Sequence, residues 1–264
     1  MTAFYNEIDP YAAQWLRNLI AAEHIAHGVV DERSIEDIEP AELDGYTQCH
    51  FFAGIGVWSL ALRNAGWSDD RPVWTGSCPC QPFSSAGKGA GFDDERHLWP
   101  AFHHLIEQCR PPVVIGEQVA SKDADTWIDL VQTDMEALGY AFGAIPFPAS
   151  GVGAPHIRDR LYWLADSDSH RCEAGHGIQL HGSEHDAQYG SGSNDEQPRP
   201  TNGHWRDADW LICRDGKWRP VESGTFPLAH GAASRVGRLR AYGNAINAVQ
   251  AQIFVECYME GQSC

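Results

Sequence analysis

The sequence lacks the features that mark several specialised classes of protein. Its eight cysteines include no CxxC pair, so neither a disulfide framework nor a paired-cysteine zinc site is expected. No apolar run approaches the roughly 18 residues that span a bilayer. The first ten residues contain no Lys or Arg, which argues against a secretory signal. We therefore expect a cytoplasmic protein with free thiols and no membrane partner.

Basic residues are scarce. The chain has 19 Lys and Arg against 36 Asp and Glu, a net charge of −17, which taken whole disfavours a nucleic-acid partner. Residues 199–240 differ, because eight basic residues there face four acids, which makes this segment +4 and the rest −21. The segment also holds Trp205, Trp210 and Trp218. This pattern is typical either of a local nucleic-acid contact or of a solvated loop.

Hydrophobic residues make up 43% of the 264 and charged residues 21%, which indicates a globular chain and not a disordered one. Apolar runs predict strands over residues 3–8, 28–30, 50–53, 73–76, 113–115, 141–147 and 160–165. Helical patterns alternate with them over residues 10–22, 57–64, 98–108, 127–138 and 245–258. This alternation predicts an α/β fold with an open sheet covered by helices on both faces.

Residues 166–204 are rich in Gly, His, Ser, Asp and Asn and poor in apolar side chains, which is typical of a loop. We expect a small irregular region over about 166–235, inserted into a sheet domain of residues 1–165 and 236–264. The segment includes His170, Cys172, His176, His181 and His185. Their spacings match no standard zinc pattern, so we expect no metal site.

Four short segments carry chemistry. Residues 52–56 place Gly54 and Gly56 between a strand and a helix, which suits a ligand close to the backbone or simply a tight turn. Cys80 lies in Pro-Cys-Gln-Pro-Phe-Ser (79–84), just past the end of a strand, where a thiol nucleophile is favoured over a metal ligand. Glu117 follows the strand over 113–115. It either points into the crevice at the carboxyl ends of the strands or caps a helix.

The fourth segment precedes the strand over 160–165 and contains Arg158 and Arg160, which by their spacing point the same way. In order, the segments 52–56, 79–84, 117–119, 158–160 and 243–245 resemble the signature series of the DNA (cytosine-5) methyltransferases. The resemblance covers most of the chain except residues 166–235. That stretch corresponds to the variable target-recognition region of the family.

The resemblance implies a Rossmann-like methyltransferase sheet that uses S-adenosylmethionine and acts on a cytosine flipped out of double-stranded DNA. It implies that Cys80 adds to cytosine C6, that protonated Glu117 faces N3, that Arg160 contacts O2 and that Arg158 lies beside it. It also assigns Phe52, Gly54, Gly56, Leu98 and Asn244 to the cofactor site. A cognate restriction endonuclease is a candidate partner for such an enzyme, which we expect to be a monomer.

The sequence departs from the family at His50, His97, Gln118 and His156, from which we expect altered packing and not loss of the reaction. A larger departure is length. Only 22 residues separate Gly56 from Pro79, too few for the two βα units that should lie there, one of which ends in the ribose-binding acid.

Near the N-terminus, residues 6–12 and 30–35 resemble the two family motifs in which a strand ends in an acid. This suggests a permuted chain, with these two motifs ahead of the glycine segment. Such an order would suit a phage or prophage enzyme. Glu7 would then bind the ribose hydroxyls, Ile8 would pack on the adenine and Asp31 would accept from its amino group. The alternative is that residues 1–47 form an unrelated arm. Rival functions are methylation of RNA, DNA binding by a catalytically dead paralogue and, less well supported, a restriction nuclease. The recognition sequence cannot be read from these residues.

Overall fold

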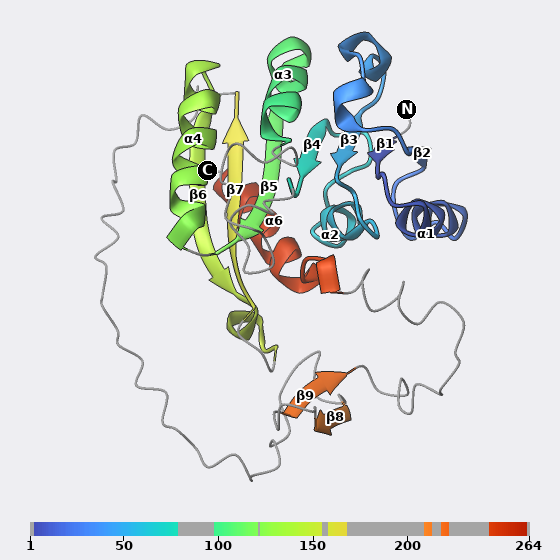
Figure 1. Cartoon of the computed structure of the whole chain (residues 1–264), viewed down its shortest axis with the longest axis vertical. Helices are drawn as coiled ribbons and strands as arrows, with labels where there is room; N and C mark the ends of the chain where they lie inside the picture. Colours follow the sequence, from blue (N-terminus) through green and yellow to red (C-terminus); the bar gives the residue numbers. More distant parts are fainter. Residues whose placement is uncertain are drawn as a thin grey trace.

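The computed structural model describes residues 3–78, 98–120, 122–154, 158–167, 209–212, 218–221 and 243–262. Seven of the described strands form one sheet in the order β2-β1-β3-β4-β5-β7-β6 (Figure 1). These strands are β1 (Ala3–Asn6), β2 (Gly28–Asp31), β3 (Gln48–Phe51), β4 (Val73–Gly76), β5 (Val113–Val119), β6 (Ala141–Pro148) and β7 (Asp159–Asp166). Strands β1 to β5 pair in parallel, and β7 lies antiparallel between β5 and β6. The predicted α/β fold is confirmed.

Helices cover both faces of the sheet. On one face, α3 (Trp99–Cys109) and α4 (Lys122–Ala137) pack against the largest core cluster, which also receives Ile35 of η1 (Ile35–Asp37) and Leu43 of η2 (Pro40–Leu43). On the other face lie α1 (Pro10–Ala21), α2 (Val57–Asn64) and α6 (Ala248–Gly261) (Figure 1). Because α2 and α6 share a core cluster, the last helix of the chain packs beside the helix that follows the glycine segment.

Local sequence signals explain where the helices begin. The Asp9 carboxylate accepts from the backbone N–H groups of Tyr11 and Ala12, and Pro10 occupies the first helical position of α1, an arrangement that satisfies free donors at a helix start. Asn247 caps α6 in the same way through Val249 and Gln250. Helix α2 instead begins after Gly56, whose φ of 79° places it in the left-handed region, which favours glycine.

Several elements differ from the sequence prediction. Strand β1 ends at Asn6 and not at residue 8, β3 spans Gln48–Phe51 and not 50–53, α4 begins at Lys122 and not at 127, and α6 begins at Ala248 and not at 245. Strand β5 continues to Val119, beyond the apolar run that ends at Ile115, because its last residues pair with β7 as far as Val119 opposite Arg160. Within the region expected to be irregular, β8 (Asp209–Ile212) and β9 (Trp218–Val221) pair antiparallel. Their apolar residues flank Asp215-Gly216 in the sequence, a dipeptide that favours hairpin turns.

Among the residues that the structure describes, no helix is long and apolar enough to cross a membrane. The division into residues 1–165 with 236–264 and residues 166–235 stays a prediction, because most of the second segment lies outside the described ranges.

Candidate active site

The predicted site residues follow strands that run in the same direction. Because β1, β3, β4 and β5 are parallel neighbours, the residues after their carboxyl ends gather at one edge of the sheet. The register pairs Asn6 with Phe51, and the Ala53 N–H donates to the Asn6 carbonyl at 3.0 Å. Strand β1, which precedes Glu7, therefore lies beside β3, which precedes Ala53, although 46 positions separate these two residues.

Glu7 faces the glycine segment. The Gly54 N–H donates to Glu7 Oε2 at 2.7 Å, and the Asp9 N–H donates to Oε1 at 2.8 Å. Gly54 has a φ of 55°, and a Cβ there would meet no atom within 4 Å, so backbone conformation and not space calls for glycine. Gly56 also has a positive φ, and its Cβ would lie 3.0 Å from Leu16 Cδ2. Both Glu7 oxygens are thus held at this edge of the sheet by backbone N–H groups.

Asp31 lies beside Glu7, because the Glu7 N–H donates to the Asp31 carbonyl at 2.9 Å. Its carboxylate, however, is occupied by Arg33, whose Nη2 lies 2.6 Å from Oδ2 and whose backbone N–H donates to Oδ1 at 2.8 Å. Arg33 also pairs with Glu42 at 3.1 Å. The hydrogen bonds and charge of Arg33 hold the pKa of Asp31 below its ordinary value. Asp31 is thus an ionised acceptor that already has a strong partner.

The remaining residues predicted for the cofactor differ in their surroundings. Phe52 has a φ of 52° and meets Phe102 edge-on at 6.1 Å. Phe52 and Leu98 both pack on the core cluster under α3. Ile8 is 67% exposed, which leaves its side chain open to contact with a ligand ring. Asn244 is exposed, between two residues whose carbonyls bind Arg158.

Glu117 and the two arginines are brought together. Arg160 Nε lies 2.7 Å from Glu117 Oε1, and the two side chains are 17% and 9% exposed. Arg158 has a φ of 35°, and its Nη2 donates to the carbonyls of Gly243, at 3.1 Å, and of Ala245. Burial raises the pKa of Glu117 above its ordinary value, while the positive charges of Arg160 and Arg158 oppose that rise. Such a carboxyl can hold a proton for a buried acceptor.

Cys80 and the rest of segment 79–84 lie outside the described residues, as do His97 and His156. The backbone of Cys78, two residues before Cys80, is nevertheless held beside Glu117 by a hydrogen bond from the next residue, Gln118. Gln118 Nε2 donates to the carbonyl of Cys78 at 3.2 Å, and Cys78 itself is buried. The residue after the acid therefore holds the backbone that leads into the predicted nucleophile segment.

His50, one of the departures from the family pattern, is a packing residue. It is fully buried, its Nδ1 lies 2.8 Å from Thr75 Oγ1 and its Nε2 lies 3.3 Å from Gln48 Oε1. Its ring stacks on Tyr5 at 4.9 Å. Burial lowers the pKa of His50 to about 3, so the imidazole is neutral at physiological pH.

Two residues close to Glu117 have no role in the sequence prediction. Ser77 follows β4, and its Oγ accepts from Trp58 Nε1 at 3.1 Å. The register that pairs Gly76 with Gly116 places Ser77 beside Glu117. A polar residue directly after a buried apolar strand was the available sequence signal for Ser77. Trp58 offered no such signal, because an aromatic residue in an amphipathic helix is ordinary core.

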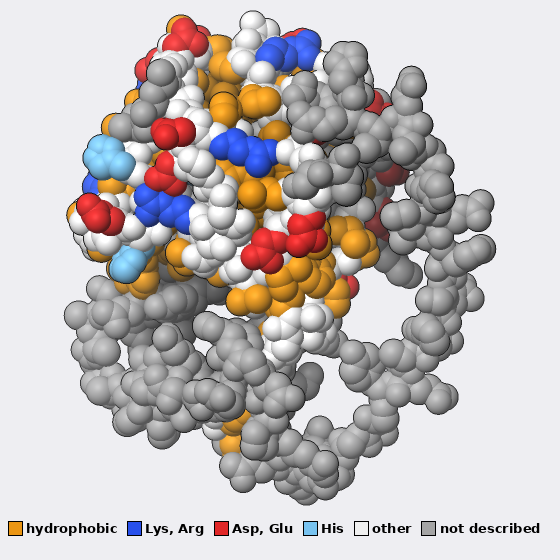
Figure 2. Space-filling model, turned by 180° about the vertical axis from the view of Figure 1, so that it is seen from behind, with side chains coloured by type: hydrophobic (Ala, Val, Ile, Leu, Met, Phe, Trp, Pro, Cys, Tyr) orange, Lys and Arg blue, Asp and Glu red, His pale blue; other side chains and the backbone are white. Residues whose placement is uncertain are grey.

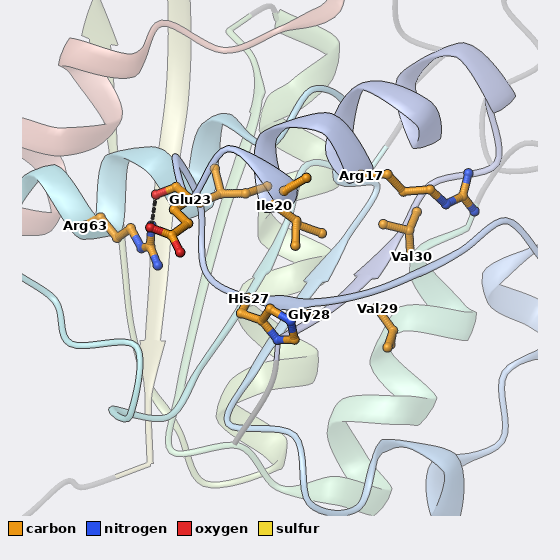
Figure 3. Close-up of a pocket in the computed structure, with 10 residues that line it drawn as sticks. Arg17, Ile20, Glu23, His27, Gly28, Val29, Val30 and Arg63 are labelled. Carbon is orange, nitrogen blue, oxygen red and sulfur yellow. Dashed lines mark hydrogen bonds between the residues drawn. The ribbon is translucent and has the colours of Figure 1, made fainter.

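A cavity of about 880 Å³ lies elsewhere, at the amino end of β2 (Figure 3). Its walls come from α1, the connection from α1 to β2, the first residues of β2, and Arg63 of α2. Arg63 donates to the Glu23 carbonyl across one end of it, and Arg17 and Val30 lie toward the other (Figure 3). None of the predicted site residues lines this cavity.

Within the described ranges, no group of three or more His, Cys, Asp or Glu side chains could hold a metal ion. The histidine-containing stretch over 170–185 lies outside those ranges. On the face in Figure 2, the Lys and Arg side chains drawn in blue lie apart from one another, among acidic and hydrophobic ones. The described part of this face offers no continuous basic surface.

Comparison with known proteins agrees with the sequence motifs. Residues 69–191 match the family model of C-5 cytosine-specific DNA methylases. The Type II methyltransferase M.HhaI of Haemophilus parahaemolyticus is 27% identical over 167 residues, covering 48% of this chain and 51% of that protein. M1.ScrFI of Lactococcus lactis subsp. cremoris is 33% identical over 97 residues, covering 35% of this chain and 25% of that protein. The chain therefore spans about half or less of these relatives' lengths.

A solved structure of a mutant DNMT2 from Spodoptera frugiperda aligns with a TM-score of 0.39 and 14% identity, covering 64% of this chain and 51% of that chain. Over residues 69–191 the chain is thus similar to the C-5 cytosine-specific DNA methylases, and parts of it are similar to these two Type II methyltransferases.

Proposed function

We propose that this protein methylates cytosine C5 in double-stranded DNA with S-adenosylmethionine as the methyl donor. The observation that carries the proposal is the buried Glu117–Arg160 pair at the carboxyl edge of the sheet, 2.7 Å apart. A carboxyl whose pKa is raised by burial, held beside a cation, suits recognition of a cytosine edge that offers N3 and O2.

The chemistry explains why such a pair is needed. Cytosine C5 is too weak a nucleophile to accept a methyl group directly. We propose that the Cys80 thiolate adds to C6, that Glu117 donates its proton to N3, and that Arg160 binds O2. S-adenosylmethionine supplies the methyl group to C5. Loss of the C5 proton and of the Cys80–C6 bond, with return of the N3 proton to the Glu117 carboxylate, then restores the aromatic ring and the free thiolate.

The residues at the edges of β1 and β3 fit the donor. Glu7 presents two carboxylate oxygens beside the backbone of Gly54, which suits the two hydroxyls of a ribose. Exposed Ile8 suits contact with the adenine ring, with Asp31 as acceptor for its amino group. We assign Phe52, Gly56, Leu98 and Asn244 to the same site, on the resemblance in motif order.

We further propose that the chain is a permuted member of the family, in which the ribose-binding strand precedes the glycine segment. The parallel pairing of β1 with both β2 and β3 supports this order. Residues 1–165 and 236–264 then make the catalytic part, and residues 166–235 select the target sequence. A monomer acting with a cognate restriction endonuclease is the arrangement that we expect from the Type II relatives.

Bisulfite sequencing of DNA from a host that expresses the protein tests the proposal directly. We expect 5-methylcytosine in one sequence context, and none in cells that express Glu117→Ala. Transfer of labelled methyl groups to tRNA but not to duplex DNA would replace the proposal with RNA methylation. Binding to duplex DNA without any transfer would indicate a catalytically dead relative.

A further inference from the structure

Ser77 and Glu117 occupy neighbouring positions on adjacent strands. The register of β4 and β5 pairs Gly76 with Gly116, so the next residue along each strand is Ser77 and Glu117. Side chains alternate between the two faces of a sheet. Val73 and Ile115 point into the core shared by α2 and α6, so Ser77 and Glu117, at even spacing from them, lie on that same face.

Trp58 fixes the Ser77 hydroxyl from the side of α2. The indole Nε1–H donates to Ser77 Oγ at 3.1 Å, and an indole nitrogen can only donate. Ser77 Oγ is therefore the acceptor in this bond, and its own proton stays free for another partner. The Trp58 ring is itself held, since it is 5% exposed and meets the Tyr162 ring edge-on at 5.9 Å.

We propose that Trp58 and Ser77 are positioning residues for Glu117, with the indole N–H orienting the serine hydroxyl so that it donates to the Glu117 carboxyl. This inference rests on the proposed function, because it concerns the acid that meets the base. Arg160 holds Oε1 of the same carboxyl from β7. The two contacts come from opposite neighbours of β5 and together restrict rotation of the carboxyl group.

The serine contact also sets the protonation of the acid. A hydrogen bond donated to a carboxylate favours its charged form, so Ser77 lowers the pKa of Glu117 and opposes the rise caused by burial. A general acid works best when its pKa lies near the working pH. Trp58 is the second residue of α2, directly after the glycine segment. One side-chain connection therefore links the proposed cofactor loop to the proposed acid.

The test uses the full chain with five single variants, one of which serves only to assign the infrared band. Ser77→Ala removes the hydroxyl, Ser77→Thr keeps it, and Trp58→Phe removes the indole N–H but keeps an aromatic ring. Trp67→Phe is the matched control, because Trp67 is equally buried in the same core and donates instead to the Arg71 carbonyl at 3.0 Å. Titration of the Glu117 carboxyl is followed by infrared difference spectroscopy, with the band assigned by its loss in Glu117→Gln.

We expect the titration midpoint to rise by about 0.5–1 pH unit in Ser77→Ala and in Trp58→Phe, the size of one modest hydrogen bond. Ser77→Thr should restore the wild-type midpoint, and Trp67→Phe should leave it unchanged. An unchanged midpoint in folded Ser77→Ala would overturn the inference. An equal shift in Trp67→Phe would also overturn it, because the effect would then be general packing.

A second measurement separates this inference from the proposed function. Single-turnover methyl transfer to duplex DNA should slow about 2- to 10-fold in Ser77→Ala and Trp58→Phe. The high-pH limb of the pH–rate profile should move to higher pH together with the titration midpoint of the carboxyl. Absence of methyl transfer by the wild type would exclude the proposed function. The infrared midpoints would still decide whether Ser77 and Trp58 control the protonation of Glu117. If the wild type is active and both variants keep its high-pH limb, only the positioning role of Ser77 and Trp58 is excluded.

Discussion

The Glu7 carboxylate accepts a hydrogen bond from the backbone N–H of Gly54 at 2.7 Å, across 47 positions of sequence. The two residues follow adjacent parallel strands, β1 and β3. An acid supplied by a strand that precedes the glycine segment thus reaches the backbone where a cofactor is proposed to bind. Substitution of Glu7 is therefore the most direct test of the proposed cofactor site.

Glu7→Ala should weaken binding of S-adenosylmethionine by about 1.5–3 kcal/mol, the range for hydrogen bonds to a charged group. Isothermal titration calorimetry on the purified variant measures it. Glu32→Ala is a suitable control, since that exposed carboxylate pairs with Arg17 and has no proposed contact with the cofactor. Wild-type affinity in Glu7→Ala would remove Glu7 from the cofactor site and with it the support for a permuted order.

Asp31→Ala should weaken cofactor binding less than Glu7→Ala does. Its carboxylate already accepts from Arg33 through both oxygens, and only one ligand donor, the adenine amino group, is proposed to use it. The same calorimetric titration compares the two variants. A larger loss in Asp31→Ala than in Glu7→Ala would reverse the proposed roles of the two acids.

Cys80→Ser should abolish methylation and leave the free energy of unfolding close to that of the wild type. Duplex DNA with 5-fluorocytosine at the target should trap the wild-type protein covalently, because fluorine cannot leave as the C5 proton does. Denaturing gel electrophoresis detects the adduct, and Cys78→Ser should still form it. Trapping that survives Cys80→Ser but is lost in Cys78→Ser would show that Cys78, and not Cys80, is the nucleophile.

The stability of Glu117→Gln relative to that of the wild type should increase as pH rises. Burial raises the folded-state pKa of Glu117 above its unfolded value, so the wild type loses stability as pH rises from the unfolded pKa, about 4.3, through the folded pKa. Glutamine resembles the neutral form and avoids that loss. Urea denaturation at a series of pH values should show a difference that grows with pH and then levels off. A difference that shrinks as pH rises would mean that Arg160 outweighs burial.

Neutralising Arg206, Arg214 and Arg219 together should weaken binding to duplex DNA and flatten its salt dependence. The reason is that every phosphate which the protein no longer neutralises keeps its counterions on the DNA. Affinity for S-adenosylmethionine should stay unchanged. Fluorescence anisotropy at several salt concentrations measures the slope. A slope equal to that of the wild type would exclude residues 199–240 from the DNA interface.

Most elements of the sheet domain could be predicted from apolar patterning, because buried strands and amphipathic helices carry it over several residues. The strand bounds were less predictable where pairing, and not hydrophobicity, extends a strand. Glu117 and Gln118 are polar, yet they continue β5 because β7 pairs with them. The hairpin of β8 and β9 shows the converse, since its short apolar runs were hidden in a polar region.

In the candidate site, too, some features could be predicted from the sequence and others depend on packing. Glu7, Gly54, Glu117 and Arg160 stand at or next to the ends of predicted strands, so their place at one edge follows from chain direction alone. The contact of Ser77 with Trp58 depends on how α2 packs over β4. The occupation of Asp31 by Arg33 depends on the path of the chain after β2. Neither contact has a sequence pattern of its own.

The sequence by itself determined the alternation of strands and helices, the order of the motifs and the excess of acid, because each is written in local residue types. The tertiary structure alone decided that β1 lies between β2 and β3, that burial raises the pKa of Glu117, and which side chains hold that carboxyl. Strand order and burial arise from contacts between residues far apart in the chain, and periodicity within one segment carries no information about them.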